Sequence, residues 1–296
     1  MKTHPDTFLG RLALASRPSR PWLHVRASGW WSRVLLAAGA RQASWAGQDL
    51  SIQILTNANL SGANLTSTDL SAAHLSEADL TSADLTGANL SEADLTGTDL
   101  TGAFLGQAYA DQAVLNRALL IGADLAHAKL SGAELNYADL TGAELNYADL
   151  TGARLYRANL TNAHLSYGRL IGANLTETGL TDADLTGADL TGADLTGADL
   201  TGASLIVADL TGANLTETGL NGAVLTGANL TDADLTDAKL TDANLTDAIW
   251  SVRTRWPVAL GNTMLRRSVP IGGGKWRVQG AGNSGADLEV PLVPVP

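Results

Sequence analysis

The chain has 296 residues, a formal net charge of -11 and no cysteine, which excludes disulfides and thiolate metal sites. No apolar run approaches the roughly 18 residues that a membrane span requires, so we expect none. Residues 46–250 hold 27 acids and 6 bases, whereas the segments on either side are basic. An acidic body of this kind repels nucleic acid, and we expect no direct nucleic-acid binding by it.

The first segment, residues 1–45, is basic and rich in Arg and Trp. We interpret it as a disordered leader; the alternative is a start site placed too far upstream, so that these residues do not belong to the native protein. Its short apolar run, residues 34–38, is bracketed by Arg33 and Arg41, which argues against a signal peptide. A cytoplasmic location is therefore the default expectation, and secretion is the less favoured alternative.

The second segment, residues 46–250, is a continuous array of pentapeptides. Of the forty positions counted in fives from Leu50 to Leu245, thirty-nine are Leu and one is Ala110. From Ala58 onward a small residue precedes each of these positions by two, and Asp or Asn usually stands between them. A fixed internal period of this kind is typical of a solenoid.

A five-residue period matches neither a helix nor a simple strand. It does match three extended residues followed by a two-residue corner. Alternate residues of an extended chain share a face, so the Leu and the small residue point inward together while Asp or Asn points outward. The remaining pair, usually Thr-Gly, makes the corner, where Gly relieves steric limits.

The unit A-[DN]-L-[ST]-x, seen for example at residues 188–192, closely resembles the repeat of the pentapeptide repeat family. The resemblance covers residues 46–250. It implies an all-β fold, a right-handed quadrilateral parallel β-helix with four pentapeptides per coil and about ten coils here. Tyr147 and Tyr167, which are 20 residues apart, agree with that coil length.

The third segment, residues 251–296, leaves the repeat. Trp250 replaces the expected Leu, and the stretch from Ile271 to the end is rich in Gly, Pro and Val. This composition predicts a short cap followed by a flexible Gly/Pro-rich tail.

One coil differs from the rest of the array on its outside. If positions 20 apart are stacked, residues 101–120 lose the outward Asp or Asn on all four faces at once, and apolar or aromatic residues replace them: Phe104, Tyr109, Val114 and Leu119. We call these four residues the girdle. One interpretation is a locally degenerate coil; the other is a contact surface, covered by a second copy, by another protein or by the Trp-rich leader.

A second group of outward residues combines tyrosine with arginine. Arg117, Tyr137, Arg157 and Glu177 follow one another at intervals of 20, and so do Tyr147 and Tyr167. The spacing predicts cation–π contacts and ion pairs between coils. This group is either a surface ladder that satisfies itself or a recognition patch, because Tyr and Arg are favoured at interfaces.

A third group is acidic and lies toward the C-terminal end. Asp184, Asp189, Asp194 and Asp199 are expected on the four faces, and Asp232, Asp237, Asp242 and Asp247 at the corners. They either keep an apolar rod soluble or imitate the phosphate charge of DNA.

We find no catalytic constellation, phosphate-binding loop or metal-ligand spacing in the array, so we expect no enzyme activity, cofactor or metal. The sequence favours a non-catalytic structural or interaction module with a protein partner, and a homodimer is one alternative. The family resemblance adds another alternative: some members imitate DNA, bind DNA gyrase and protect it from quinolone drugs.

Overall fold

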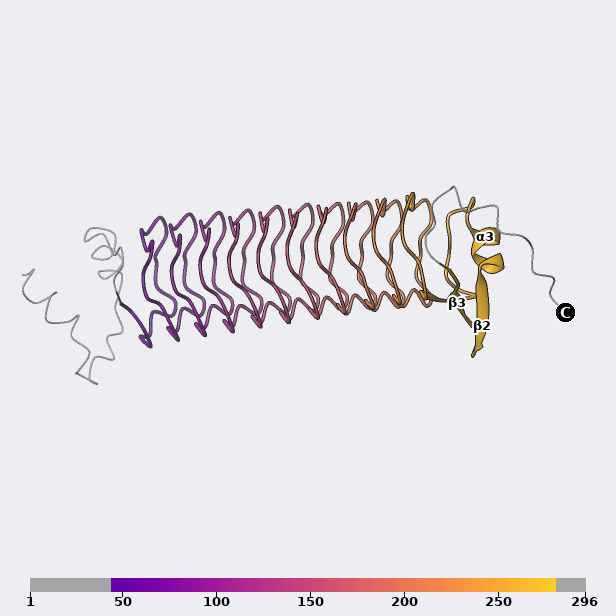
Figure 1. The fold of residues 1–296 in the computed structure, drawn as a ribbon. Helices are drawn as coiled ribbons and strands as arrows, with labels where there is room; N and C mark the ends of the chain where they lie inside the picture. The colour runs from indigo at the N-terminus through magenta and orange to yellow at the C-terminus, as the bar shows by residue number, and fades with distance from the viewer. Residues whose placement is uncertain (1–43, 281–296) are drawn as a thin grey trace, which may run out of the picture.

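The computed structural model describes residues 44–280, and these form a rod of stacked coils closed at its C-terminal end by a small cap (Figure 1). Isolated parallel bridges join each outward residue to the one 20 positions later, from Ser44↔Asn64 to Asn229↔Ile249. Four pentapeptides therefore make one coil. The expectations for a disordered leader and for a flexible end lie largely outside the described residues.

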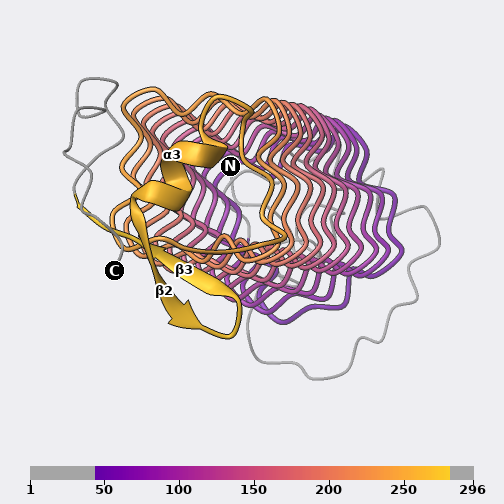
Figure 2. The ribbon, with the colours of Figure 1, turned by 90° about the vertical axis from the view of Figure 1, so that its right-hand side faces the viewer.

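Backbone hydrogen bonds hold each coil to the next. The Leu150 N–H donates to the Arg169 carbonyl at 2.7 Å, and the Arg169 N–H donates to the Ala148 carbonyl at 2.9 Å. This pair of bonds recurs along the array. Successive coils therefore lie in register one behind the other (Figure 2).

The inward residues form one continuous core along the rod. The Leu at every fifth position from Leu55 to Leu245 is buried, as is Ala110, which takes the place of one of them. The four threonines at small-residue positions are also buried: Thr68, Thr98, Thr178 and Thr218. The Thr178 hydroxyl donates to the Leu155 carbonyl at 2.8 Å, so this buried polar group is satisfied without water.

Each corner requires one residue in the left-handed region of the backbone. Gly192 has a φ of 64°, and Tyr147, at the same position of another pentapeptide, has a φ of 60°. Gly adopts this conformation without cost, whereas other residues are strained there by roughly 1–2 kcal/mol. Gly is therefore preferred at this position because of the left-handed backbone, as the sequence predicts. The many other residues that occupy it, such as Tyr147, carry some backbone strain.

The cap closes the core at the C-terminal end. Strands β1 (Ile249–Ser251), β2 (Ser268–Gly272) and β3 (Lys275–Val278) form an antiparallel sheet in the order β1-β3-β2, and helix α3 spans Gly261–Arg266. Trp250, Met264 and Val278 are buried against the last coil.

Part of the segment predicted to be flexible is therefore ordered. The sequence places Ile271 at the start of the flexible end, but Ile271 and Gly272 belong to β2 and Lys275–Val278 forms β3. The glycines make the turn between two strands, and β3 pairs with β1 of the array. Pairing to a preformed edge orders a stretch whose composition alone suggests a loose end.

Candidate protein-interaction surfaces

The girdle lies on the outside of the coil formed by residues 101–120. Phe104, Tyr109 and Leu119 are exposed, Phe104 by 51%, while Val114 is half-buried. Each stands one position before a buried Leu or Ala, in the place that Asp or Asn occupies in most coils. The structure therefore puts the four residues on four faces of one coil, as the sequence indicates.

A third exposed apolar residue, Ile121, stands at the corner that follows Leu119. Leu119 and Ile121 are both exposed, and the Ile121 carbonyl accepts a hydrogen bond from the Gly102 N–H, two residues before Phe104. We call Phe104, Leu119 and Ile121 the apolar edge. The sequence reasoning missed Ile121, although Ile at a position usually held by Thr or Ser was the available signal.

The apolar edge is surrounded by carboxylates. Phe104 forms bridges with Asp84 and Asp124, and Leu119 with Asp99 and Asp139, in the coils before and after. These four aspartates are only partly exposed. The edge is thus a small apolar surface within an acidic wall.

The arginine and tyrosine group forms contacts between coils, but not all of the predicted ones. The Arg157 Nε lies 2.6 Å from a Glu177 carboxylate oxygen, and Arg154 pairs with Glu134 at 3.1 Å. The Arg157 guanidinium lies over the ring of Tyr156, its neighbour in the chain, rather than over Tyr137, which the 20-residue spacing favoured. Tyr156 was not anticipated because it stands at the other corner position, which is usually Thr.

A second aromatic group stacks at the diagonally opposite corner of the same coils. The Tyr147 and Tyr167 rings are 5.4 Å apart between centroids and nearly parallel, as expected from their spacing. The His127 ring extends this stack, 5.0 Å from Tyr147. The Tyr167 ring in turn lies against Gly187 of the next coil, where an added Cβ would come within 2.6 Å of it.

This packing predicts different outcomes for two glycine substitutions. We expect Gly192→Ala to lower the free energy of unfolding by about 1 kcal/mol, because only the left-handed backbone opposes it; nothing lies within 4 Å of an added Cβ. Gly187→Ala should cost more, because the Cβ also displaces the Tyr167 ring. Chemical denaturation measures both. Tyr167→Ala should remove the extra cost, and equal losses at the two glycines would contradict the contact.

The acidic residues of the faces serve the fold as well as the surface. One carboxylate oxygen of Asp189 accepts hydrogen bonds from the Thr191 backbone N–H at 3.0 Å and from its hydroxyl at 2.6 Å. Asp184, Asp194 and Asp199 accept a bond from the backbone N–H two residues further on in the same way. An Asp followed by Thr at this distance is a turn signal that the sequence reasoning interpreted only as surface charge.

The corner aspartates lie nearer the cap. Asp232, Asp237, Asp242 and Asp247 are exposed, each with a positive φ. Asp232 accepts a hydrogen bond from the Ser251 hydroxyl at 2.6 Å and lies 3.5 Å from the Arg253 guanidinium. The charge of Asp232 is therefore partly matched by the cap.

These turn hydrogen bonds lower the pKa of several face carboxylates. Burial acts to raise the pKa of Asp149, but the Thr151 hydroxyl and N–H and the charge of Arg169 outweigh it, so the pKa falls below its ordinary value. At Asp199 the Thr201 hydroxyl is the strongest influence, and the pKa is again lowered. The same direction holds for Asp94, Asp184 and Asp234.

The lowered pKa values predict a loss of stability in acid. A carboxylate with a depressed pKa stabilises the fold fully above its unfolded pKa of about 3.9, and this contribution is lost as pH falls through the folded value. We expect the free energy of unfolding to fall between about pH 5 and about pH 2. Asp149→Asn with Asp199→Asn should reduce that slope. A slope equal to that of the unsubstituted chain would contradict the assignment.

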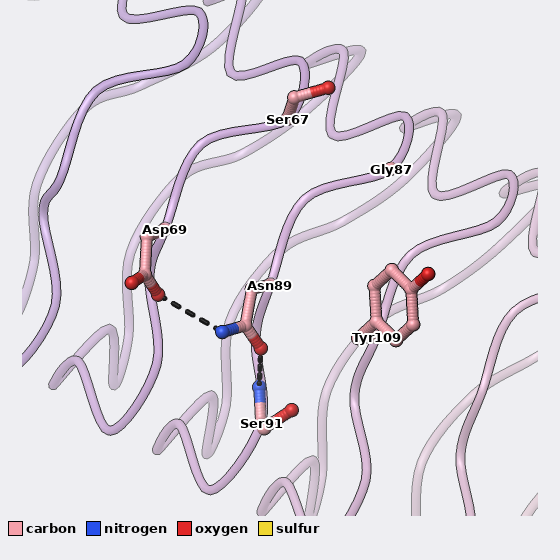
Figure 3. Close-up of a pocket in the computed structure, with 6 residues that line it drawn as sticks. All are labelled: Ser67, Asp69, Gly87, Asn89, Ser91 and Tyr109. Carbon is pink, nitrogen blue, oxygen red and sulfur yellow. Dashed lines mark hydrogen bonds between the residues drawn. The ribbon is translucent and has the colours of Figure 1, made fainter.

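A surface depression lies beside the girdle. Asp69, Asn89 and Tyr109 line it from three successive coils, with the small residues Ser67, Gly87 and Ser91 between them (Figure 3). Asn89 donates to Asp69 at 3.1 Å and accepts from the Ser91 N–H at 3.1 Å. The hollow holds about 490 Å³ and is wide open to solvent, so it does not provide the enclosure typical of small-molecule sites.

Within residues 44–280, no group of three or more His, Asp or Glu side chains could hold a metal ion. In the same range, no helix is long and apolar enough to cross a membrane.

The stacked coils, the buried leucine column and the outward turn aspartates define a class: a parallel β solenoid assembled from five-residue units. The profile described as pentapeptide repeats matches in overlapping stretches from residue 54 to residue 247. The chain belongs to the pentapeptide repeat family, whose members form right-handed quadrilateral β-helices and are generally structural or interaction proteins.

Three solved structures illustrate the similarity. HetL from the cyanobacterium Nostoc sp. strain PCC 7120, involved in heterocyst differentiation regulation, is 35% identical over 73% of this chain and 97% of its own, with a TM-score of 0.43. Rfr23 from the cyanobacterium Cyanothece 51142 is 37% identical over 35% of this chain and 63% of its own, with a TM-score of 0.27. QnrB1, a plasmid-mediated fluoroquinolone resistance protein, is 18% identical over 64% of this chain and 91% of its own, with a TM-score of 0.45. A search of curated proteins found no match.

Proposed function

We propose that this protein is a non-catalytic interaction module, a right-handed quadrilateral β-helix of about ten coils that binds a protein partner through the girdle. The observation that carries the proposal is the simultaneous replacement of Asp or Asn on all four faces of one coil. Three of the four replacing side chains are exposed. Exposed apolar side chains gathered in one coil of an otherwise acidic rod favour a contact with another molecule there.

The girdle also lacks stabilising turn hydrogen bonds that the neighbouring coils have. In those coils the outward Asp accepts the backbone N–H two residues further on, as Asp84 does from Thr86 and Asp124 from Ala126. Phe104 and Leu119 have no side-chain acceptor for such a bond. A coil that lacks the outward Asp or Asn on all four faces is easier to explain by binding than by folding, because function is commonly retained at some cost in stability.

A pair of substitutions separates binding from folding. Phe104→Asp with Leu119→Asp restores the repeat pattern, so the full chain should unfold at the same temperature or higher while it loses its protein partner. The matched control is Val207→Asp, an exposed apolar residue outside the girdle. Affinity capture compares the three proteins. Capture of the same partner in the same amount by the double variant would overturn the proposal.

The acidic columns favour a second candidate, a DNA-mimicking modulator of DNA gyrase. Residues 46–250 carry a net charge of -21, distributed over the faces and corners, and a relative named for fluoroquinolone resistance shares the repeat. Gyrase supercoiling, with and without a quinolone, tests this in the presence of the full chain. Drug protection, or inhibition that weakens steeply with salt, would support mimicry; no effect at micromolar concentrations would reject it.

A further inference from the structure

The cap carries an apolar groove on its outer side. It has a volume of about 370 Å³, and the residues that line it include Trp250, Trp256, Trp276, Val258 and Leu265. Trp250 stacks on Trp276 at 5.0 Å and meets Trp256 edge-on at 5.9 Å, so the floor is rigid. Val258 is 96% exposed, and Leu265 is also exposed.

The segment that forms the cap has a charge opposite to that of the rod. Residues 249–280 contain six bases and no acid. Arg253 and Arg255 already bind carboxylates of the rod, Asp232 at 3.5 Å and Asp234 at 2.9 Å. None of the six bases lines the groove itself, but five are next in the chain to a residue that does. The cap thus combines an apolar groove with a basic segment, a combination suited to an apolar side chain near carboxylates.

The apolar edge has that composition. Phe104, Leu119 and Ile121 are exposed, and aspartates lie in the coils above and below Phe104 and Leu119. The apolar parts of the two surfaces match, and their charges are opposite. Complementary potentials of this kind specify a partner and its orientation.

We propose that the cap groove binds the apolar edge of a second copy of this chain. The proposal rests on the proposed function, since it names the partner of the girdle. Cap and edge are different surfaces, so the contact is heterologous and leaves one free cap and one free edge on every pair. The protein therefore assembles into open chains of copies that grow with concentration, and their growth is weakened by salt.

Two variants of the full chain test the contact. The edge variant carries Phe104→Asp and Leu119→Asp, and the cap variant carries Val258→Asp and Leu265→Asp. All four substitutions lie at exposed positions, and far-ultraviolet circular dichroism checks that each variant keeps the fold. Sedimentation velocity follows their association over roughly 1 to 200 µM, a range suited to a small interface.

We expect the unsubstituted chain to form a series of species larger than a dimer, and each variant alone to remain monomeric. An equimolar mixture of the two variants should form dimers and stop there, because one intact cap and one intact edge remain. The decisive result is a fraction of dimer in the mixture at least tenfold higher than the fraction in either variant alone. Val207→Asp, outside both surfaces, should assemble like the unsubstituted chain.

Three outcomes would overturn the proposal: an unsubstituted chain that stays monomeric at the highest concentration, a cap variant that assembles normally, or a mixture that stays monomeric. None of these decides the role of the girdle by itself. If the unsubstituted chain captures a different protein and the edge variant does not, the girdle is an interaction surface and only its partner was assigned wrongly. If the edge variant loses nothing, the proposed function fails as well.

Discussion

Leu190→Ala is expected to lower the free energy of unfolding by about 2–5 kcal/mol, the range for removing a fully buried leucine side chain. Leu190 has no exposed surface and lies in a continuous column of leucines. Because each coil contacts only its neighbours, the loss weakens two interfaces at once and should broaden the unfolding transition. Urea denaturation followed by circular dichroism measures both effects.

Glu217→Ala is the matched control for this substitution. Glu217 stands at an exposed corner with a φ of 59°. Its replacement by Ala deletes about as many side-chain atoms as Leu190→Ala does, but these atoms face solvent and not the core. We expect a change within about 0.5 kcal/mol. Comparable losses in the two variants would mean that the leucine column does not dominate the stability of the rod.

A chain that ends after Asp247 is expected to aggregate and to melt at a much lower temperature than the full chain. The deletion removes Trp250, Met264 and Val278, which are buried at the end of the core. It also removes the bonds that the Asp247 N–H donates to the Val278 carbonyl and that the Val278 N–H donates to the Ala248 carbonyl. An open solenoid end exposes both apolar side chains and unpaired backbone groups, which favour association edge to edge.

A chain that ends after Gly280 supplies the control, because it keeps the whole cap. A thermal melt should distinguish the two truncations, and so should light scattering at concentrations below those at which cap and edge are expected to associate. Only the shorter chain should then form aggregates. A monomeric and equally stable chain ending at Asp247 would show that the last coil needs no cover.

Turn chemistry was the part of the array that the sequence reasoning underestimated. The outward Asp and Asn residues were assigned to the surface correctly, but most also bind the corner backbone, as Asp189 does with Thr191. The signal was present in the Asp-Leu-Thr order. The bond itself depends on the direction of the side chain, which the repeat pattern does not give.

Contacts between side chains of neighbouring coils were predicted with mixed success. The stack of Tyr147 on Tyr167 and the pair Arg157–Glu177 follow the 20-residue spacing. The contact of Arg157 with Tyr156 does not, because a long side chain at a corner can turn sideways to its neighbour as easily as along the column.

Four features can be read directly from the amino-acid sequence: the period, the inward leucines, the corners that favour glycine and the coil that lacks outward acids. These follow from the alternation of an extended chain and from the steric limits of the left-handed backbone, which are local properties. Three features needed the folded chain: the order of β2 and β3, the groove lined by three tryptophans, and the exposure of Ile121 at the corner after Leu119. Those features depend on how segments distant in the sequence pack at the end of the rod and around its corners. The repeat period contains no information about that packing.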